Sequence, residues 1–108
     1  MSLSTHVLDN ARGEPAAGVP VTLERHDGHG WVAVASGRTD ADGRLRDWVP
    51  AQGWDAGRYR LVFDTGAYLG PDAFFPEVSV VFAVADPARH HHVPLLLSPF
   101  GYATYRGS

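Results

Sequence analysis

The sequence contains no cysteine and no lysine. Without cysteine, no disulfide can cross-link the fold, and no thiolate can act as a nucleophile or as a soft metal ligand. All nine basic residues are arginines, which are scattered along the chain, and the formal net charge is −3. Such a distribution offers no basic patch of the kind that binds nucleic acid or a membrane surface, so we expect neither partner.

Long apolar segments are also missing. No stretch approaches the roughly 20 apolar residues that cross a bilayer, and the first residues lack the pattern of a secretory signal. We therefore expect a cytoplasmic protein. The chain has 108 residues, of which 44% are apolar, and we expect a single domain over residues 1–108. A chain of this size can bury roughly two-thirds of its unfolded surface in one core.

The apolar residues recur mostly with a period of two, which is typical of half-buried β-strands. Strands are expected near residues 5–10, 19–26, 31–35, 45–48, 58–64, 77–84, 90–97 and 102–106. Between residues 65 and 76, glycine and proline leave space for one or two helical turns at most. About eight short strands separated by turn sequences predict an all-β sandwich of two packed antiparallel sheets.

The strand expected at 90–97 is apolar on both faces. Val93, Leu95 and Leu97 point one way, whereas Pro94 and Leu96 point the other way. A monomeric sandwich would leave the second face in water, so we infer that another copy of the chain covers it in a symmetric homo-oligomer. The alternative is that a loop or the short helix covers this face.

Histidine and arginine are the residues best suited to chemistry, because common hydrolase and phosphate-binding motifs are absent. His90 and His92 share one strand face, and His92 lies on the side expected at the interface. An imidazole there can act as an acid or a base near neutral pH, although it could instead simply bond a backbone carbonyl. His6 lies on the first strand, and Arg44 can offer a permanent cation to an oxyanion.

Two metal sites match parts of the sequence. His90 and His92 could bind zinc together with His6, although the spacing alone favours this less than a structural role. The segment 40–43 resembles the start of a calcium loop, but the later acidic ligands are missing and an ordinary Asp-Gly turn explains it. We therefore expect no metal.

Several segments resemble the 5-hydroxyisourate hydrolase family, the transthyretin-related enzymes of urate breakdown. They are THVLD, GEPAAGVPVTLER, RTDADGRL, FFPEV and HHVPLLLSPFGYATYRGS. The similarity runs from Thr5 to Ser108, and the terminal Tyr-Arg-Gly-Ser separates the hydrolases from true transthyretins. His91 and Phe100 stand where the family often has tyrosine, and Ala103 stands where it often has serine.

The resemblance implies a transthyretin-like sandwich of two four-stranded sheets with one short helix. It also implies a homotetramer, a dimer of dimers, whose active sites lie at the dimer–dimer interface. The implied reaction is hydrolytic opening of the six-membered ring of 5-hydroxyisourate to 2-oxo-4-hydroxy-4-carboxy-5-ureidoimidazoline, without a metal or an organic cofactor.

The family's catalytic residues fall on His6, Arg44, His92 and Ser108, and its substrate-binding residues fall on His6, Arg44 and Tyr105. Water attack on a ring carbonyl needs a base, a cation near the developing negative charge and a pocket that fixes the ring. On this interpretation, the two histidines supply the base and its partner, and Arg44 stabilises the charge. Tyr105 holds the planar substrate, and the Ser108 hydroxyl or carboxylate orients water or an imidazole, so the end of the last strand forms a wall of the site.

Two alternatives share the predicted sandwich. One is a transthyretin-like carrier of a small aromatic ligand, and the other is a module that serves only for interaction. Two histidines and an arginine would line a hormone-sized apolar channel poorly, which favours the enzyme.

Overall fold

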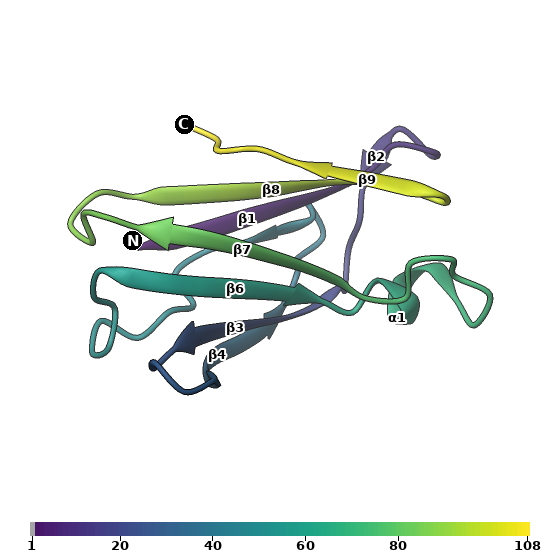
Figure 1. Ribbon diagram of the computed structural model, residues 1–108. Helices are drawn as coiled ribbons and strands as arrows, with labels where there is room; N and C mark the ends of the chain where they lie inside the picture. Colours follow the sequence, from purple (N-terminus) through teal and green to yellow (C-terminus); the bar gives the residue numbers. More distant parts are fainter. Residues whose placement is uncertain (1) are drawn as a thin grey trace.

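Two β-sheets pack face to face in the computed structural model, which describes residues 2–108 (Figure 1). In chain order the elements are β1 (Leu3–Asp9), β2 (Glu14–Pro15), β3 (Pro20–His26), β4 (Trp31–Arg38), β5 (Arg44–Leu45), β6 (Gly57–Phe63), α1 (Thr65–Leu69), β7 (Val78–Val84), β8 (His91–Ser98) and β9 (Gly101–Thr104). One sheet has the order β2-β1-β8-β9, with β5 also paired to β1, and the other has the order β4-β3-β6-β7.

The predicted all-β sandwich with one short helix is confirmed. The first sheet has five strands rather than four, because the two-residue strands β2 and β5 pair with different parts of β1.

The period-two alternation predicts the core correctly on β6. Tyr59, Leu61 and Phe63 are fully buried between the sheets. Full burial of one such side chain stabilises the fold by roughly 1.5–3 kcal/mol, so three on one strand form a substantial part of the core. The Tyr59 hydroxyl is also satisfied, since it donates to the Asp55 carbonyl oxygen at 2.8 Å and accepts from the Asp55 amide at 3.1 Å.

The prediction of purely antiparallel sheets is wrong for one pair of strands. β1 and β8 run parallel, with Leu3 opposite His91 and Asp9 opposite Leu97. Parallel neighbours need a long connection, and here almost the whole chain lies between the two strands. The buried Thr5 hydroxyl adds a further link, because it donates to the Val93 carbonyl oxygen at 2.6 Å.

The regular alternation expected for residues 31–35 is also wrong. The register of β3 and β4 shifts between Leu23 and Glu24, so that Leu23 pairs with Ala35 and Glu24 pairs with Ala33. Val34 is therefore the extra residue of a β-bulge, and both Val34 and Ala35 pack against the core. An inserted residue breaks the two-residue period, which explains the failure of the pattern.

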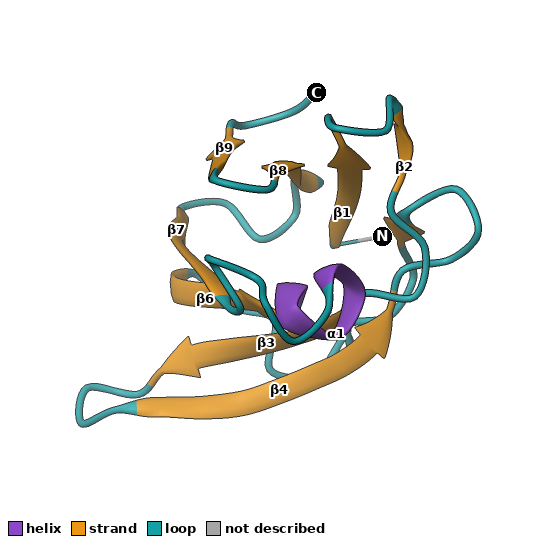
Figure 2. Ribbon diagram, turned by 90° about the vertical axis from the view of Figure 1, so that its right-hand side faces the viewer, coloured by secondary structure: helices purple, strands orange, loops and turns teal. Residues whose placement is uncertain are grey.

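The short helix closes one end of the sandwich, where Figure 2 shows it between the two layers. The Asp64 carboxylate caps α1 by accepting from the Ala67 amide at 3.1 Å, and Gly70 ends the helix with a φ of +101°. The Tyr68 hydroxyl donates to the Asp9 carboxylate at 2.7 Å and so ties α1 to β1. Within the described residues 2–108, no helix is long and apolar enough to span a membrane.

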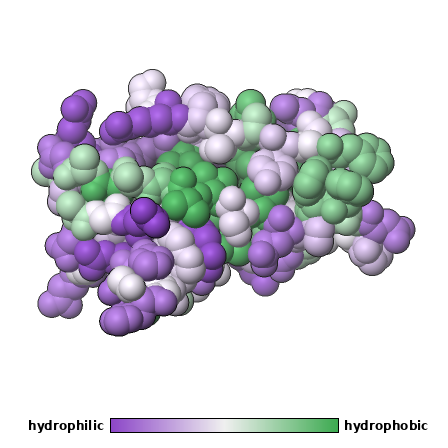
Figure 3. Space-filling view, in the orientation of Figure 1, coloured by the Kyte–Doolittle hydropathy of each residue, from purple (hydrophilic) through white to green (hydrophobic). Residues whose placement is uncertain are grey.

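The exposed apolar side chains are not the ones that the sequence predicts. Val93, Leu95 and Leu97 face the core as predicted, but Pro94 is already buried in the single chain and Leu96 is half-buried. The large exposed apolar side chains lie elsewhere, at Val32, Phe74, Val81, Phe100, Tyr102 and Tyr105. Figure 3 shows apolar surface in a band over β7 and toward the end of the molecule where β8 turns into β9.

Candidate active site

Three strands distant in the sequence bring the predicted catalytic residues to the outer face of the five-stranded sheet. On β1, His6 lies opposite Arg44 of the antiparallel strand β5. Side chains directly opposite each other in such a pair lie on the same face, about 5 Å apart at Cβ. On the other side of β1, Ser4 lies opposite His92 of β8. The pairing of β1 with both neighbours therefore gathers His6, Arg44 and His92.

A tight turn positions Arg44. The Asp40 carboxylate accepts hydrogen bonds from the backbone amides of Asp42 at 2.8 Å and of Arg44 at 3.0 Å. These bonds lower the pKa of the Asp40 carboxyl, with the Arg44 amide as the largest cause. Gly43 has a φ of +74°, and a Cβ there would lie 2.5 Å from the Val7 carbonyl oxygen. Only glycine suits this position, so the turn enters β5 in one defined geometry.

A pocket of about 190 Å³ opens beside these strands. It is lined by Ser4, Thr5, Arg44, Arg46, His90, His92 and Ser108. Three of the four predicted catalytic residues, Arg44, His92 and Ser108, thus line one pocket. His6 is not among the lining residues, but its imidazole is close enough to Arg44 for the two charges to interact.

Ser4 and Gly107 both contact His92. Its Nδ1 atom lies 2.7 Å from the Ser4 hydroxyl oxygen. The Gly107 amide donates to the His92 carbonyl oxygen at 2.8 Å, and a Cβ on Gly107 would collide with the imidazole ring. Burial lowers the pKa of His92 most, and Arg44 and then His6 lower it further. The neutral form is therefore favoured near pH 7, as a general base requires.

His6 is the second neutral imidazole of the site. Burial is the main cause that lowers its pKa, Arg44 adds to the effect, and the backbone of Asp42 opposes it. The His6 Nε2 atom is buried and has no hydrogen-bond partner within residues 2–108. An unpaired buried nitrogen costs free energy that a new partner would recover.

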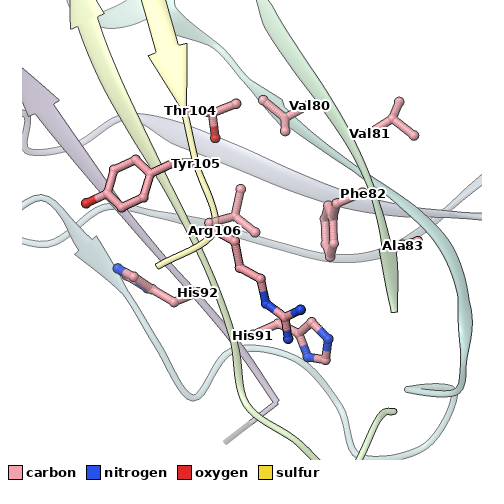
Figure 4. Close-up of a pocket in the computed structure, with 10 residues that line it drawn as sticks. Val80, Val81, Phe82, Ala83, His91, His92, Thr104, Tyr105 and Arg106 are labelled. Carbon is pink, nitrogen blue, oxygen red and sulfur yellow. The ribbon is translucent and has the colours of Figure 1, made fainter. Parts of the chain in front are cut away.

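Tyr105 lines a second, neighbouring pocket of about 250 Å³, which lies between β7 and the C-terminal segment. His92 also lines this pocket, so it borders both spaces. In Figure 4 the rings of Tyr105 and His92 project to the same side of the C-terminal segment. The structure therefore brings Tyr105 close to His92 but does not include it in the pocket of Arg44 and Ser108.

The three consecutive histidines point in the directions that the period of two predicts. His90 and His92 share a face, since both bond the Ser4 hydroxyl. His91 turns inward, where its ring meets the edge of Trp54 at a centroid distance of 5.9 Å and its Nδ1 lies 2.8 Å from the Arg89 carbonyl oxygen.

Sequence reasoning did not select Ser4 or Arg46 for the site. The period of two could have found Ser4, because it shares a strand face with His6 two residues further on. Arg46 follows β5 with the same spacing from Arg44. In the part of the chain that the structure describes, no three histidine, aspartate or glutamate side chains are grouped as metal ligands.

The profile of the HIUase/Transthyretin family matches residues 3–107. The chain belongs to this family. A 5-hydroxyisourate hydrolase of Salmonella dublin is 47% identical over 109 residues, which cover 98% of this chain and 80% of that protein. The solved 5-hydroxyisourate hydrolase of Klebsiella pneumoniae superposes with a TM-score of 0.84 at 39% identity and covers all of both chains.

A member of the family with a binding function is similar in fold. Sea bream transthyretin, solved in complex with thyroxine, gives a TM-score of 0.90 at 36% identity and covers 99% of this chain and 95% of that chain. The resemblance inferred from the sequence is confirmed at the level of the HIUase/Transthyretin family, and the two kinds of relative must be separated by their site residues.

Proposed function

We propose that this member of the HIUase/Transthyretin family is a 5-hydroxyisourate hydrolase. It opens the six-membered ring of 5-hydroxyisourate to 2-oxo-4-hydroxy-4-carboxy-5-ureidoimidazoline during urate degradation. One observation supports this most strongly: Arg44, His92 and Ser108 line a single pocket. The 47% identity to a relative named as this hydrolase agrees with the proposal.

In the proposed reaction, His92 is the general base. Its low pKa leaves an unprotonated ring nitrogen near neutral pH, because burial and the Arg44 cation both disfavour the imidazolium. That nitrogen takes a proton from water while the water oxygen attacks the ring carbonyl carbon. General base catalysis of this kind contributes roughly 10²–10⁴ in rate.

Arg44 stabilises the negative charge that forms on the carbonyl oxygen. Its guanidinium remains protonated at any working pH, so it can act as a cation and hydrogen-bond donor but not as the base. The turn around Asp40 holds Arg44 in place before the substrate binds. A donor that is already positioned stabilises the developing charge without having to rearrange during the reaction. His6, opposite Arg44 in the register, binds the substrate and can give its unpaired Nε2 a partner.

Ser108 and Tyr105 complete the proposed site from the C-terminal segment. Ser108 lines the pocket with Arg44 and orients water or an imidazole. Tyr105 holds the planar substrate from the neighbouring pocket. His92 lines both pockets, so it borders the space of Tyr105 and the space of Ser108, which fits its role as the base.

We further propose that the protein works in the cytoplasm as a homotetramer, a dimer of dimers. The exposed apolar residues on β7, near α1 and at the turn between β8 and β9 support association, because a monomer rarely exposes so many large apolar side chains. A symmetric assembly of identical copies would cover them. Fractionation of cells and light scattering test these two statements.

The activity is tested with 5-hydroxyisourate generated freshly from urate by urate oxidase. The ultraviolet absorbance of the substrate should decay much faster with the protein than without it. Decay at the spontaneous rate, together with saturable binding of thyroxine, would instead support the carrier that the similarity to sea bream transthyretin suggests.

A further inference from the structure

The Ser4 hydroxyl lies between two imidazoles. Its oxygen is 2.8 Å from His90 Nε2 and 2.7 Å from His92 Nδ1. Ser4 itself is buried, with 8% of its surface exposed, whereas His90 is exposed. A hydroxyl carries one proton, so it can donate to only one of these two nitrogens while it accepts from the other.

The direction of these two hydrogen bonds determines whether neutral His92 can act as a base. If Ser4 donates to His90, it accepts from a proton on His92 Nδ1, and the lone pair of His92 is on Nε2. If Ser4 donates to His92, the only proton of neutral His92 is on Nε2. Nδ1 is already occupied by Ser4, so this second arrangement leaves no ring nitrogen able to take a proton from water.

We propose that Ser4 and His90 form a positioning pair that holds neutral His92 with its proton on Nδ1 and its lone pair on Nε2. This inference rests on the proposed role of His92 as the general base. In the reaction an O–H bond of water breaks, its proton forms the N–H bond at Nε2, and the remaining hydroxide oxygen bonds the ring carbonyl carbon while the C=O electron pair moves to the carbonyl oxygen. When the C=O bond re-forms, the ring C–N bond breaks, and the leaving nitrogen takes the proton from Nε2. The Nδ1 proton stays directed at Ser4, whose oxygen stabilises the imidazolium.

A matched pair of variants isolates the hydroxyl. Ser4→Thr keeps the oxygen and Ser4→Val replaces it with a methyl group in a side chain of nearly the same shape, and both residues suit a strand. We expect kcat/KM for freshly generated 5-hydroxyisourate to be about tenfold or more lower in the Val variant than in the Thr variant. Equal kcat/KM in the Thr and Val variants would overturn the proposal.

Nitrogen-15 NMR of the imidazoles provides a test that does not need turnover. In the unmodified protein at neutral pH, we expect His92 to carry its proton on Nδ1, and we expect the Val variant to shift toward the Nε2–H form. An Nε2–H tautomer in the unmodified protein would overturn the positioning role. The hydrolase proposal would still be decided separately by turnover of the unmodified protein.

Discussion

The imidazole of His92 combines two properties that a base needs at neutral pH. Burial disfavours its charged form, and the Arg44 cation disfavours that form further. Both effects lower the pKa of His92 below the ordinary value of about 6.5. Neither effect can be seen in the sequence, because it depends on which groups the strands bring beside the ring.

A pH profile tests this environment. The imidazolium cannot accept a proton, so kcat/KM should fall as the pH decreases through the pKa of His92, and the midpoint should lie below about 6.5. Above that midpoint, activity should stay level through pH 7.5. The measurement is kcat/KM from pH 5 to 8, corrected for the spontaneous decay of the substrate. An acidic midpoint above 7 would mean that another group is the base.

Removal of the Arg44 charge should have a large effect on catalysis and a small effect on folding. Loss of one preorganised stabilising group typically lowers kcat by 10²–10³, and we expect this for Arg44→Gln. Arg58→Gln is the matched control, because Arg58 is exposed on β6 in the other sheet. Steady-state kinetics and thermal unfolding of both variants give the comparison. Nearly full activity in the Arg44→Gln variant would show that Arg44 does not stabilise the transition state.

At the scale of elements, the C-terminal segment and β8 depend on each other through a close approach. Gly107 pairs with His92 as an isolated β-bridge. Its Cα lies so close to the imidazole ring that a methyl group on Gly107 would clash with the ring. The terminal motif of the sequence therefore includes a glycine for a steric reason. Its neighbours, Tyr105 and Ser108, are placed in the two pockets by the same bridge.

Gly107→Ala should displace the His92 ring and lower kcat. A displacement of about 1 Å can cost roughly 10² in rate. Gly30→Ala is a suitable control, because a Cβ at Gly30 meets no atom within 4 Å and Gly30 lies between β3 and β4, away from His92. We expect the control to retain turnover and both variants to keep a cooperative unfolding transition. If Gly107→Ala turned over substrate as fast as the control, the contact with His92 would have no catalytic importance.

The sequence predicted the elements better than their pairing. The alternation of Tyr59, Leu61 and Phe63 marked the core face of β6 because the ladder there is regular. The bulge opposite Leu23 and the parallel pairing of β1 with β8 could not be predicted, since both depend on long-range register.

The same limit applies to the site. Residue type and the family resemblance selected His6, Arg44 and His92. The period of two could place Ser4 on the same strand face as His6, but it could not predict the contact of Ser4 with two histidines, which arises only once β1 and β8 pair in parallel. The resemblance also placed Tyr105 and Ser108 together, whereas the single chain separates them into adjoining pockets.

At the scale of the whole molecule, exposed apolar side chains lie on the edge strands of the four-stranded sheet. Val81 on β7 is 54% exposed and Val32 on β4 is 51% exposed. Val81 lines the pocket that includes Tyr105, and Figure 3 shows apolar surface over β7. We therefore expect a second copy to cover the β7 edge in the proposed assembly.

Val81→Arg should dissociate the assembly, because a buried interface does not tolerate an unpaired charge. Val32→Arg, at a similarly exposed valine on the opposite edge, should leave the molar mass unchanged. Light scattering at several concentrations measures the molar mass of each variant. A Val81→Arg variant with the same mass as the unmodified protein would show that this edge lies outside the interface.

The central claim is that His92 drives the hydrolysis of 5-hydroxyisourate in a pocket that it shares with Arg44 and Ser108. The most direct measurement follows the absorbance of freshly generated substrate with the unmodified protein and with His92→Asn, both treated with a chelator. We predict rapid decay with the unmodified protein and a rate lower by roughly 10²–10⁴ with the variant. Equal rates for the two proteins, or decay no faster than without protein, would contradict the claim.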